Sequence, residues 1–208
     1  MGEPAGPVAN GSGVTRVLWH NPRMSMFADR PDRALLVIDV QQGVVHDAYR
    51  RDEVVARIAA LVASARSGGV PVVWVQHNEP EMAIGSEFWQ LVPGLEPAAD
   101  EPRIDKQYRS SFEGTDLEAV LERLGAGSLV ICGAQTNNCV RHTVHAALDR
   151  GYDVTLVEDA HTTSDSDWES GPILASFTID EQNRSCLDYD MPGRRCDLTT
   201  TAEAFANP

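Results

Sequence analysis

Four continuous apolar runs alternate with segments of helical spacing along this 208-residue chain. The apolar runs are residues 34–40, 70–76, 128–134 and 153–159. They are rich in Val, Ile and Leu and lack polar alternation, which is typical of strands buried on both faces. The helical segments between them are residues 52–66, 115–124 and 138–150. This order predicts right-handed βαβ units, and therefore an α/β fold: a three-layer αβα sandwich around a mostly parallel sheet of five or six strands.

The rest of the chain divides into a tail and one domain. Residues 1–30 begin with a Gly/Pro-rich stretch and are expected to form an N-terminal tail or arm, followed by a single domain over residues 31–208. Within the domain, residues 78–111 are proline-interrupted and are expected to be a long functional loop. A helix over 171–182 and a short strand near 195–199 are expected to complete the fold.

The net charge and the hydropathy of the chain limit the kinds of molecule that it is expected to bind. Seventeen basic and 31 acidic residues give a net charge of −14, which disfavours nucleic acid and is compatible with a cationic small molecule. A solvated acidic surface explains the same charge without any ligand. Because no apolar stretch reaches the ~18 residues needed to span a bilayer and no signal-peptide pattern opens the chain, we expect a cytoplasmic protein without a membrane partner.

The four cysteines are too few and too unevenly spaced for a disulfide-stapled scaffold. A bridge between Cys186 and Cys196 is conceivable, but nothing else indicates an oxidising compartment, and we do not expect it. Cys132 lies inside an apolar run and is interpreted as a buried structural thiol.

Polar side chains follow the predicted strands where ligands bind in parallel sheets, at the carboxyl ends. Asp39 closes the first apolar run, His77 and Asn78 follow the second, and Cys139 follows the third. Cys139 is expected in the first turn of a helix, where backbone N–H groups and the helix dipole would stabilise a thiolate. Asp39 is either a general base beside this thiol or a cap on a neighbouring turn.

Three stretches resemble the isochorismatase-like cysteine hydrolase superfamily, in family order over about residues 34–200. They are ALLVIDVQQG, IDKQYRSSFEGTDLEAVLERLG and VICGAQTNNCVRHTVHAALDRGYDVTLVEDAHTT. The third is most similar to the streptothricin-hydrolase-like branch, whose members open a lactam amide in a cationic antibiotic. That branch often has an aromatic residue before the cysteine, where this chain has Asn138. The resemblance implies a Rossmann-like fold.

The resemblance also implies a catalytic triad of Asp39, Lys106 and Cys139. It implies a cis peptide between Ala134 and Gln135, and an oxyanion hole made by the backbone N–H groups of Gln135 and Cys139. The implied reaction is attack of the thiolate on a carbonyl carbon, with a thioester intermediate. Lys106 by itself would be interpreted as a solvated surface lysine, so its role rests on the resemblance alone.

Strand ends and the long loop supply the expected substrate-binding residues, which are Gln41, His77, Asn78, Trp89, Tyr108 and Phe112. Nicotinamidases of the superfamily hold a metal with an Asp/His cluster. The corresponding segment here offers His46, Asp47 and His77 without close Asp-x-His spacing, so no metal and no cofactor are expected. His142, His145 and His161 are interpreted as exposed or hydrogen-bonded residues. A homo-oligomer, dimer or tetramer, is implied by resemblance.

The expected function is therefore hydrolysis of a C–N bond, either an amide or a lactam, in a small molecule. Other amidase reactions of the superfamily, of the nicotinamidase or N-carbamoyl amidohydrolase type, remain open. A binding protein without catalysis on the same fold is the alternative from a different class, because a fold does not fix a function.

Overall fold

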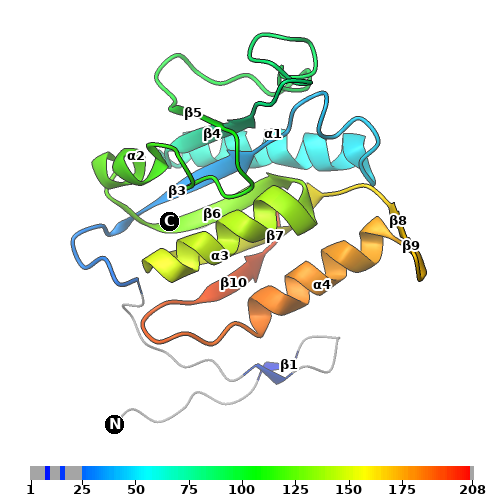
Figure 1. Ribbon diagram of the computed structural model, residues 1–208. Coiled ribbons are helices and arrows are strands. Elements are labelled where there is room, and N and C mark those ends of the chain that lie inside the picture. The colour runs from blue at the N-terminus through cyan, green and yellow to red at the C-terminus, as the bar shows by residue number, and fades with distance from the viewer. Residues whose placement is uncertain (1–7, 10–14, 17–24, 207–208) are drawn as a thin grey trace.

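A six-stranded parallel sheet forms the centre of the protein (Figure 1). The computed structural model describes residues 8–9, 15–16 and 25–206. The strand order is β10-β7-β6-β3-β4-β5. The strands are β3 (Asp32–Ile38), β4 (Val72–His77), β5 (Arg103–Lys106), β6 (Ala126–Ala134), β7 (Asp153–Thr162) and β10 (Cys196–Thr199). The chain builds outward from β3 to β5 and then returns to the other side of β3, so the order switches between β3 and β6.

Helices cover both faces of this sheet and complete the predicted three layers. They are α1 (Arg51–Ser67), α2 (Leu117–Arg123), α3 (Arg141–Arg150) and α4 (Ala175–Leu187), and a π-helical segment η1 (Thr136–Val140) precedes α3. In Figure 1, α1 lies behind the sheet and the other α-helices lie in front. The mostly parallel sheet within an αβα sandwich is confirmed, with six strands.

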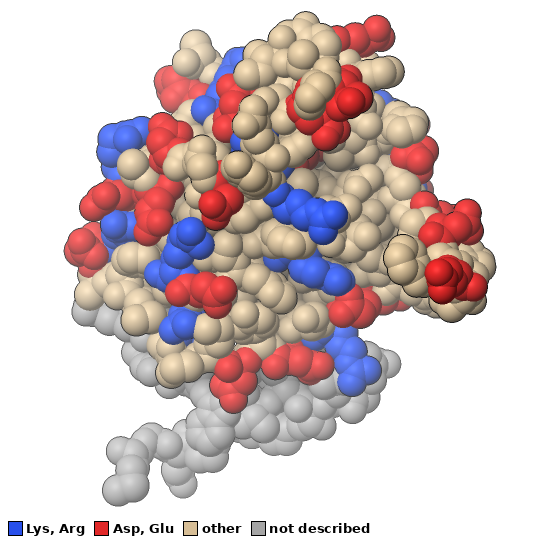
Figure 2. Space-filling view, in the orientation of Figure 1, with Lys and Arg blue, Asp and Glu red and all other residues tan. Residues whose placement is uncertain are grey.

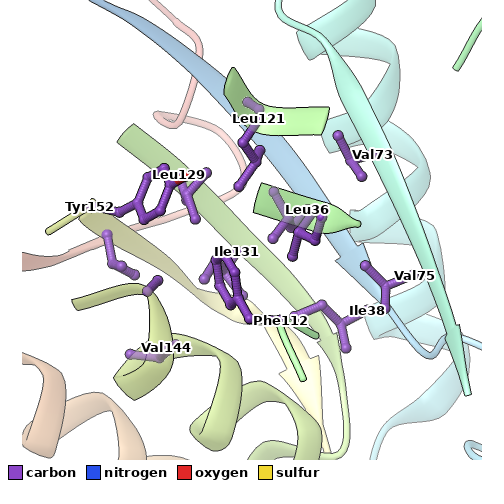
Figure 3. Packing of buried hydrophobic residues seen from close by; sticks show 14 of the residues in the cluster. Leu36, Ile38, Val73, Val75, Phe112, Leu121, Leu129, Ile131, Val144 and Tyr152 are labelled. Carbon is purple, nitrogen blue, oxygen red and sulfur yellow. The ribbon is translucent and has the colours of Figure 1, made fainter. Parts of the chain in front are cut away.

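Successive side chains of β3 point to opposite faces of the sheet, so the hydrophobic core consists of two clusters, one on each face. Leu35 and Val37 pack with the buried side of α1, whereas Leu36 and Ile38 pack with residues of α2 and α3. Figure 3 shows the second cluster, in which Leu36 and Ile38 lie among side chains from neighbouring strands and from α2 and α3. The fully buried side chains explain why the first apolar run has no polar position before Asp39.

Two small antiparallel hairpins lie outside the main sheet: β1 (Val8–Ala9) with β2 (Thr15–Arg16), and β8 (Ser166–Trp168) with β9 (Gly171–Ile173). The expected tail over residues 1–30 falls mostly outside the described residues. Its last part contacts the domain: Met26 N–H donates to the Gly151 carbonyl at 3.1 Å, and the Phe27 and Tyr152 rings lie 4.6 Å apart.

Two expected segments are wrong in their boundaries. The irregular loop over 78–111 contains strand β5, a short edge strand that alternates exposed and buried residues. The expected helix over 171–182 begins later, at Ala175, because residues 166–173 form the β8–β9 hairpin.

Figure 2 shows acidic side chains over the β8–β9 hairpin and over the loops above β4 and β5, whereas acidic and basic side chains are interspersed over α3 and α4.

The expectation of unpaired cysteines at 186 and 196 is also wrong. Cys186 near the end of α4 and Cys196 at the start of β10 form a disulfide, with their Cα atoms 5.2 Å apart. The connection between α4 and β10 folds back on itself and brings the two buried side chains together, which sequence spacing does not reveal.

None of the helices that the structure describes has the length and apolarity needed to cross a membrane.

Candidate active site

Four ionisable side chains meet at the carboxyl edge of the sheet. Asp39 follows β3 directly, His77 ends β4, Lys106 ends β5, and Cys139 lies in η1 just beyond β6. The strand register explains this meeting, since Ile38 pairs with both Val75 and Gly133, and His77 pairs with Lys106. Parallel strands in register bring their ends to one line, so residues far apart in sequence become neighbours.

Lys106 is the centre of this cluster. Its Nζ lies 2.6 Å from Asp39 Oδ2, 3.2 Å from Cys139 Sγ and 3.5 Å from His77 Nδ1. The Asp39 and Lys106 side chains have no exposed surface. An ammonium has three N–H donors, and Lys106 therefore has one acceptor for each of them.

The backbone around Asp39 and Gln135 is unusual. Asp39 has φ of 50°, and the peptide bond between Ala134 and Gln135 is cis. Gly133 has φ of +123°, and a Cβ added there would lie 2.0 Å from the Ile38 carbonyl oxygen. Only glycine permits this close approach between β6 and the residue before Asp39. The Gln135 N–H donates to none of the residues that the structure describes.

Burial controls the ionisation of the cluster. Burial and the neighbouring Asp39 carboxylate raise the pKa of the Cys139 thiol to about 12, although Lys106 opposes this shift. Burial disfavours the charge on Lys106, but Asp39 and Cys139 outweigh it and raise the pKa of the ammonium. The thiol is therefore protonated at neutral pH. Cys139 lies half-buried in the π-helical segment that precedes α3, and the Asp39 carboxylate beside it opposes the thiolate that was expected at a helix N-terminus.

A cavity of about 480 Å³ opens over this cluster. Asp39, His77, Gln135 and Cys139 reach it from the strand ends. Its remaining lining residues are Gly43, Val44, His46, Asp47, Glu79, Glu81, Met82, Phe88, Arg109, Asn138 and Ser164. A larger surface hollow of about 680 Å³ lies beside it and shares His46 and Phe88, but includes none of the cluster. The smaller cavity has an acidic rim, because the carboxylates of Asp47, Glu79 and Glu81 outnumber the single guanidinium of Arg109 there.

Of the six expected substrate-binding residues, His77 lines this cavity and the other five do not. Gln41 is fully buried and hydrogen-bonds the backbone of His77 and Trp89. Asn78 donates to the Lys106 carbonyl.

The three expected aromatic residues are also elsewhere. Trp89 contributes its carbonyl to the Gln41 and Gln76 side chains rather than its ring to the cavity. Tyr108 is exposed, and Phe112 packs in the core with its ring 5.8 Å from that of Tyr152. None of these five side chains therefore lines the cavity, because each is packed, hydrogen-bonded to the backbone or turned to solvent.

Sequence reasoning missed several cavity residues that carry charge or hydrogen-bonding groups. Glu79 and Glu81 follow the end of β4, Arg109 follows β5, and Ser164 follows β7, each by two to four residues. Asp39 and Cys139 were found because ligands bind beyond the carboxyl ends of parallel strands. The same rule, applied to every strand end, would have found these residues as well.

The histidines do not gather into a metal centre among the residues that the structure describes. His161 lies within β7, where it is buried and hydrogen-bonded between Thr136 and Asn183, at 2.9 Å from each. His142 is exposed and contacts the Asn138 carbonyl, and the His145 ring packs against Tyr189. His46 and Asp47 reach the rim of the cavity together with His77, but no cluster of three potential ligands forms there.

Comparison with known proteins places this chain in a family. The isochorismatase domain model matches residues 33–174. A streptothricin hydrolase of Streptomyces noursei is 36% identical over 139 residues, which is 64% of this chain and 50% of that protein. This chain therefore spans about half the length of that relative.

Two further relatives have more of their length covered. An uncharacterised isochorismatase family protein of Escherichia coli O157:H7 is 30% identical over 159 residues, covering 67% of this chain and 85% of that protein. The crystal structure of an isochorismatase from Pseudomonas putida KT2440 superposes with a TM-score of 0.75 at 32% identity, covering 82% of this chain and 88% of that one. This chain belongs to the isochorismatase family of hydrolases.

Proposed function

We propose that the protein is a cysteine hydrolase that cleaves an amide or lactam C–N bond, with Asp39, Lys106 and Cys139 as its catalytic triad. One observation carries this proposal: the Lys106 ammonium contacts both the Asp39 carboxylate and the Cys139 sulfur at the floor of the cavity. A buried carboxylate beside a thiol is a general base beside a nucleophile, and the lysine makes the charged pair tolerable without water.

The proposed reaction has two halves. Asp39 accepts the proton of the Cys139 thiol while Cys139 Sγ bonds to the carbonyl carbon of the substrate, and the oxyanion accepts hydrogen bonds from the Gln135 and Cys139 N–H groups. Asp39 then donates that proton to the leaving nitrogen as the C–N bond breaks, which leaves a thioester. A water molecule loses its proton to Asp39 and attacks the thioester carbon; as the C–S bond breaks, Asp39 returns the proton to Cys139 Sγ, and the acid product leaves.

Lys106 keeps its proton throughout this sequence. Its charge stabilises the thiolate when the proton is on Asp39, and the carboxylate when the proton is on sulfur. The raised pKa of Lys106 supports this role, because the ammonium remains charged although its side chain has no exposed surface.

A cationic substrate fits the rim of the cavity. Asp47, Glu79 and Glu81 line it against the single guanidinium of Arg109, and opposite charge favours binding and encounter. The named activity of the Streptomyces noursei relative supports streptothricin-type lactams as the first substrates to try. Nicotinamide-type and N-carbamoyl amides are the alternatives within the same reaction class.

Product analysis by mass spectrometry tests the proposal. Wild type and Cys139→Ala are each incubated with streptothricin, nicotinamide, N-carbamoyl compounds and simple primary amides. A gain of one water that depends on Cys139 supports the hydrolase and identifies its bond. Full turnover by Cys139→Ala would overturn the triad. No turnover, with Cys139 as unreactive toward alkylation as Cys132, would favour a binding protein on the same fold.

The proposal includes a homo-oligomer, either a dimer or a tetramer, and a cytoplasmic location. Large apolar side chains that remain exposed on and beside the β8–β9 hairpin support association of copies; they are Trp168, Ile173, Leu174 and Phe177. Light scattering measures the oligomeric state directly. Cytosolic thiols are usually kept reduced, so the disulfide between Cys186 and Cys196 argues against this location. Alkylation at lysis tests the point: free thiols at both positions would support the cytoplasm, and an intact disulfide would overturn it.

A further inference from the structure

We propose that His77 is a positioning residue for Lys106, holding the ammonium in the orientation that contacts both Asp39 and Cys139. This inference rests on the proposed triad and adds a fourth residue to it. The carrying observation is that His77 Nδ1 lies 3.5 Å from Lys106 Nζ, as the third acceptor around an ammonium that also contacts Asp39 and Cys139.

The backbone of His77 is itself held firmly. The buried Gln41 side chain donates through Nε2 to the His77 carbonyl at 2.9 Å and accepts the His77 N–H through Oε1 at 2.8 Å. The strand register adds a second restraint, since His77 pairs with Lys106 across β4 and β5. Gln41 therefore acts at the site through His77, although its side chain does not line the cavity.

The contacts of the imidazole specify its tautomer. An ammonium can only donate, so Nδ1 must carry a lone pair, and the proton of the neutral ring is on Nε2. Nε2 faces the Glu79 carboxylate, whose Oε2 lies 3.7 Å away. In this tautomer the Lys106 ammonium donates to His77 Nδ1, and the N–H of His77 Nε2 points toward the Glu79 carboxylate. Each donor therefore faces an acceptor.

Removing the acceptor has a definite consequence for Lys106. The lysine side chain has no exposed surface, whereas His77 lines the open cavity, so a mobile water would take the place of the fixed Nδ1 acceptor. An N–H without a fixed partner would favour rotation of the ammonium away from its present contacts. Because Lys106 lowers the pKa of the Cys139 thiol, a displaced ammonium makes the thiolate rarer and the sulfur less reactive.

Three substitutions separate this role from simple cavity lining. His77→Asn keeps a hydrogen-bonding group near the position of Nδ1, His77→Gln moves it to the position of Nε2, and His77→Ala removes it. His145→Gln, on α3 and outside the cavity, is the matched control. The readout is the rate at which iodoacetamide alkylates Cys139 at pH 9, followed by mass spectrometry with Cys132 as the internal reference. This rate needs no knowledge of the substrate.

We expect His77→Ala and His77→Gln to lower the alkylation rate about tenfold, the scale of one lost hydrogen bond to a charged group. His77→Asn should stay within about threefold of wild type and above His77→Gln, since it restores the acceptor. On an identified substrate, the loss should appear in kcat rather than KM. Equal rates for the Asn and Gln variants, or wild-type rates for all three, would overturn the positioning role.

Lys106→Met distinguishes failure of this inference from failure of the proposed function. If Lys106→Met slows alkylation while His77→Gln leaves it unchanged, the triad stands and His77 has no positioning role. If Lys106→Met also alkylates at the wild-type rate, Lys106 does not stabilise the thiolate, and both the triad and the inference fail.

Discussion

The Asp39 carboxylate and the Lys106 ammonium lie 2.6 Å apart, and neither side chain has any surface exposed to solvent. The contact with the Lys106 ammonium is what compensates the buried charge of Asp39, since the hydrogen bonds of the other described residues do not reach its carboxylate oxygens. Two buried charges without water depend on each other: the Coulomb attraction offsets the desolvation cost only while both are present. Stability and catalysis are therefore linked at this pair.

Removing one partner should destabilise the fold more than removing both. Asp39→Asn or Lys106→Met alone should lower the free energy of unfolding by about 3–5 kcal/mol, because each leaves an uncompensated buried charge. The double variant should lose less than the sum of the two, since no charge remains. Urea unfolding of the four proteins measures the coupling. Additive losses would show that the two groups do not stabilise each other.

The raised pKa of Cys139 predicts how its reactivity depends on pH. Iodoacetamide reacts with the thiolate, and below the pKa the thiolate fraction rises about tenfold per pH unit. With the pKa of Cys139 at about 12, the alkylation rate should climb from pH 7 to pH 9.5 without a plateau. A rate that is already constant at pH 7 would mean that Cys139 rests as a thiolate.

Gly133 should tolerate no side chain. In Gly133→Ala the new Cβ would meet the Ile38 carbonyl at 2.0 Å, at a φ of +123°. Overpacking together with this backbone conformation should cost about 3 kcal/mol or more and displace Asp39, so the proposed activity should fall as well.

Gly171→Ala is the matched control for this substitution. Its φ of +116° is similar, but nothing lies within 4 Å of the added Cβ, so it should cost only about 1–2 kcal/mol for the backbone conformation. Chemical unfolding compares the two variants. Equal losses would show that the close approach to Ile38 is unimportant.

The sequence predicted the parts of the site that local patterns encode. Asp39 interrupts an apolar run, and Cys139 follows another, so both could be placed at the carboxyl edge of a parallel sheet. Lys106 could not be placed in this way. Its strand β5 has four residues at the sheet edge, of which Ile104 and Lys106 are buried, and so short an alternation within a polar loop resembles no strand.

The directions of the expected substrate-binding side chains could not be predicted, for a different reason. Trp89 and Phe112 were expected in the cavity because of their place at or beside the long loop, but a ring's direction depends on loop backbone that only tertiary contacts determine. Phe112 packs in the core, where the Arg150 guanidinium lies 4.8 Å from the centre of its ring. The cavity instead takes charged residues of the loops, whose positions become predictable only once every strand end is known.

His161 should make stability depend on acid. Burial lowers its pKa to about 4, and its neutral ring lies between Thr136 and Asn183. The ordinary value of about 6.5 applies in the unfolded chain. Between pH 6.5 and pH 4 the unfolded state therefore binds more protons, and acid favours unfolding. This histidine should remove about 2 kcal/mol of stability between pH 7 and pH 5, although carboxylates also titrate below pH 5.

His161→Gln isolates the histidine from those carboxylates, because it retains an amide near the hydrogen-bond partners and cannot become charged. The variant should be less stable than wild type at pH 7, where the imidazole packs better, and should lose less stability on acidification. Urea unfolding at pH 7, 6 and 5 gives the two slopes, and their difference is the contribution of His161. Parallel slopes would mean that the imidazole can be protonated in the folded protein at no cost, which its buried position between the start of η1 and α4 argues against.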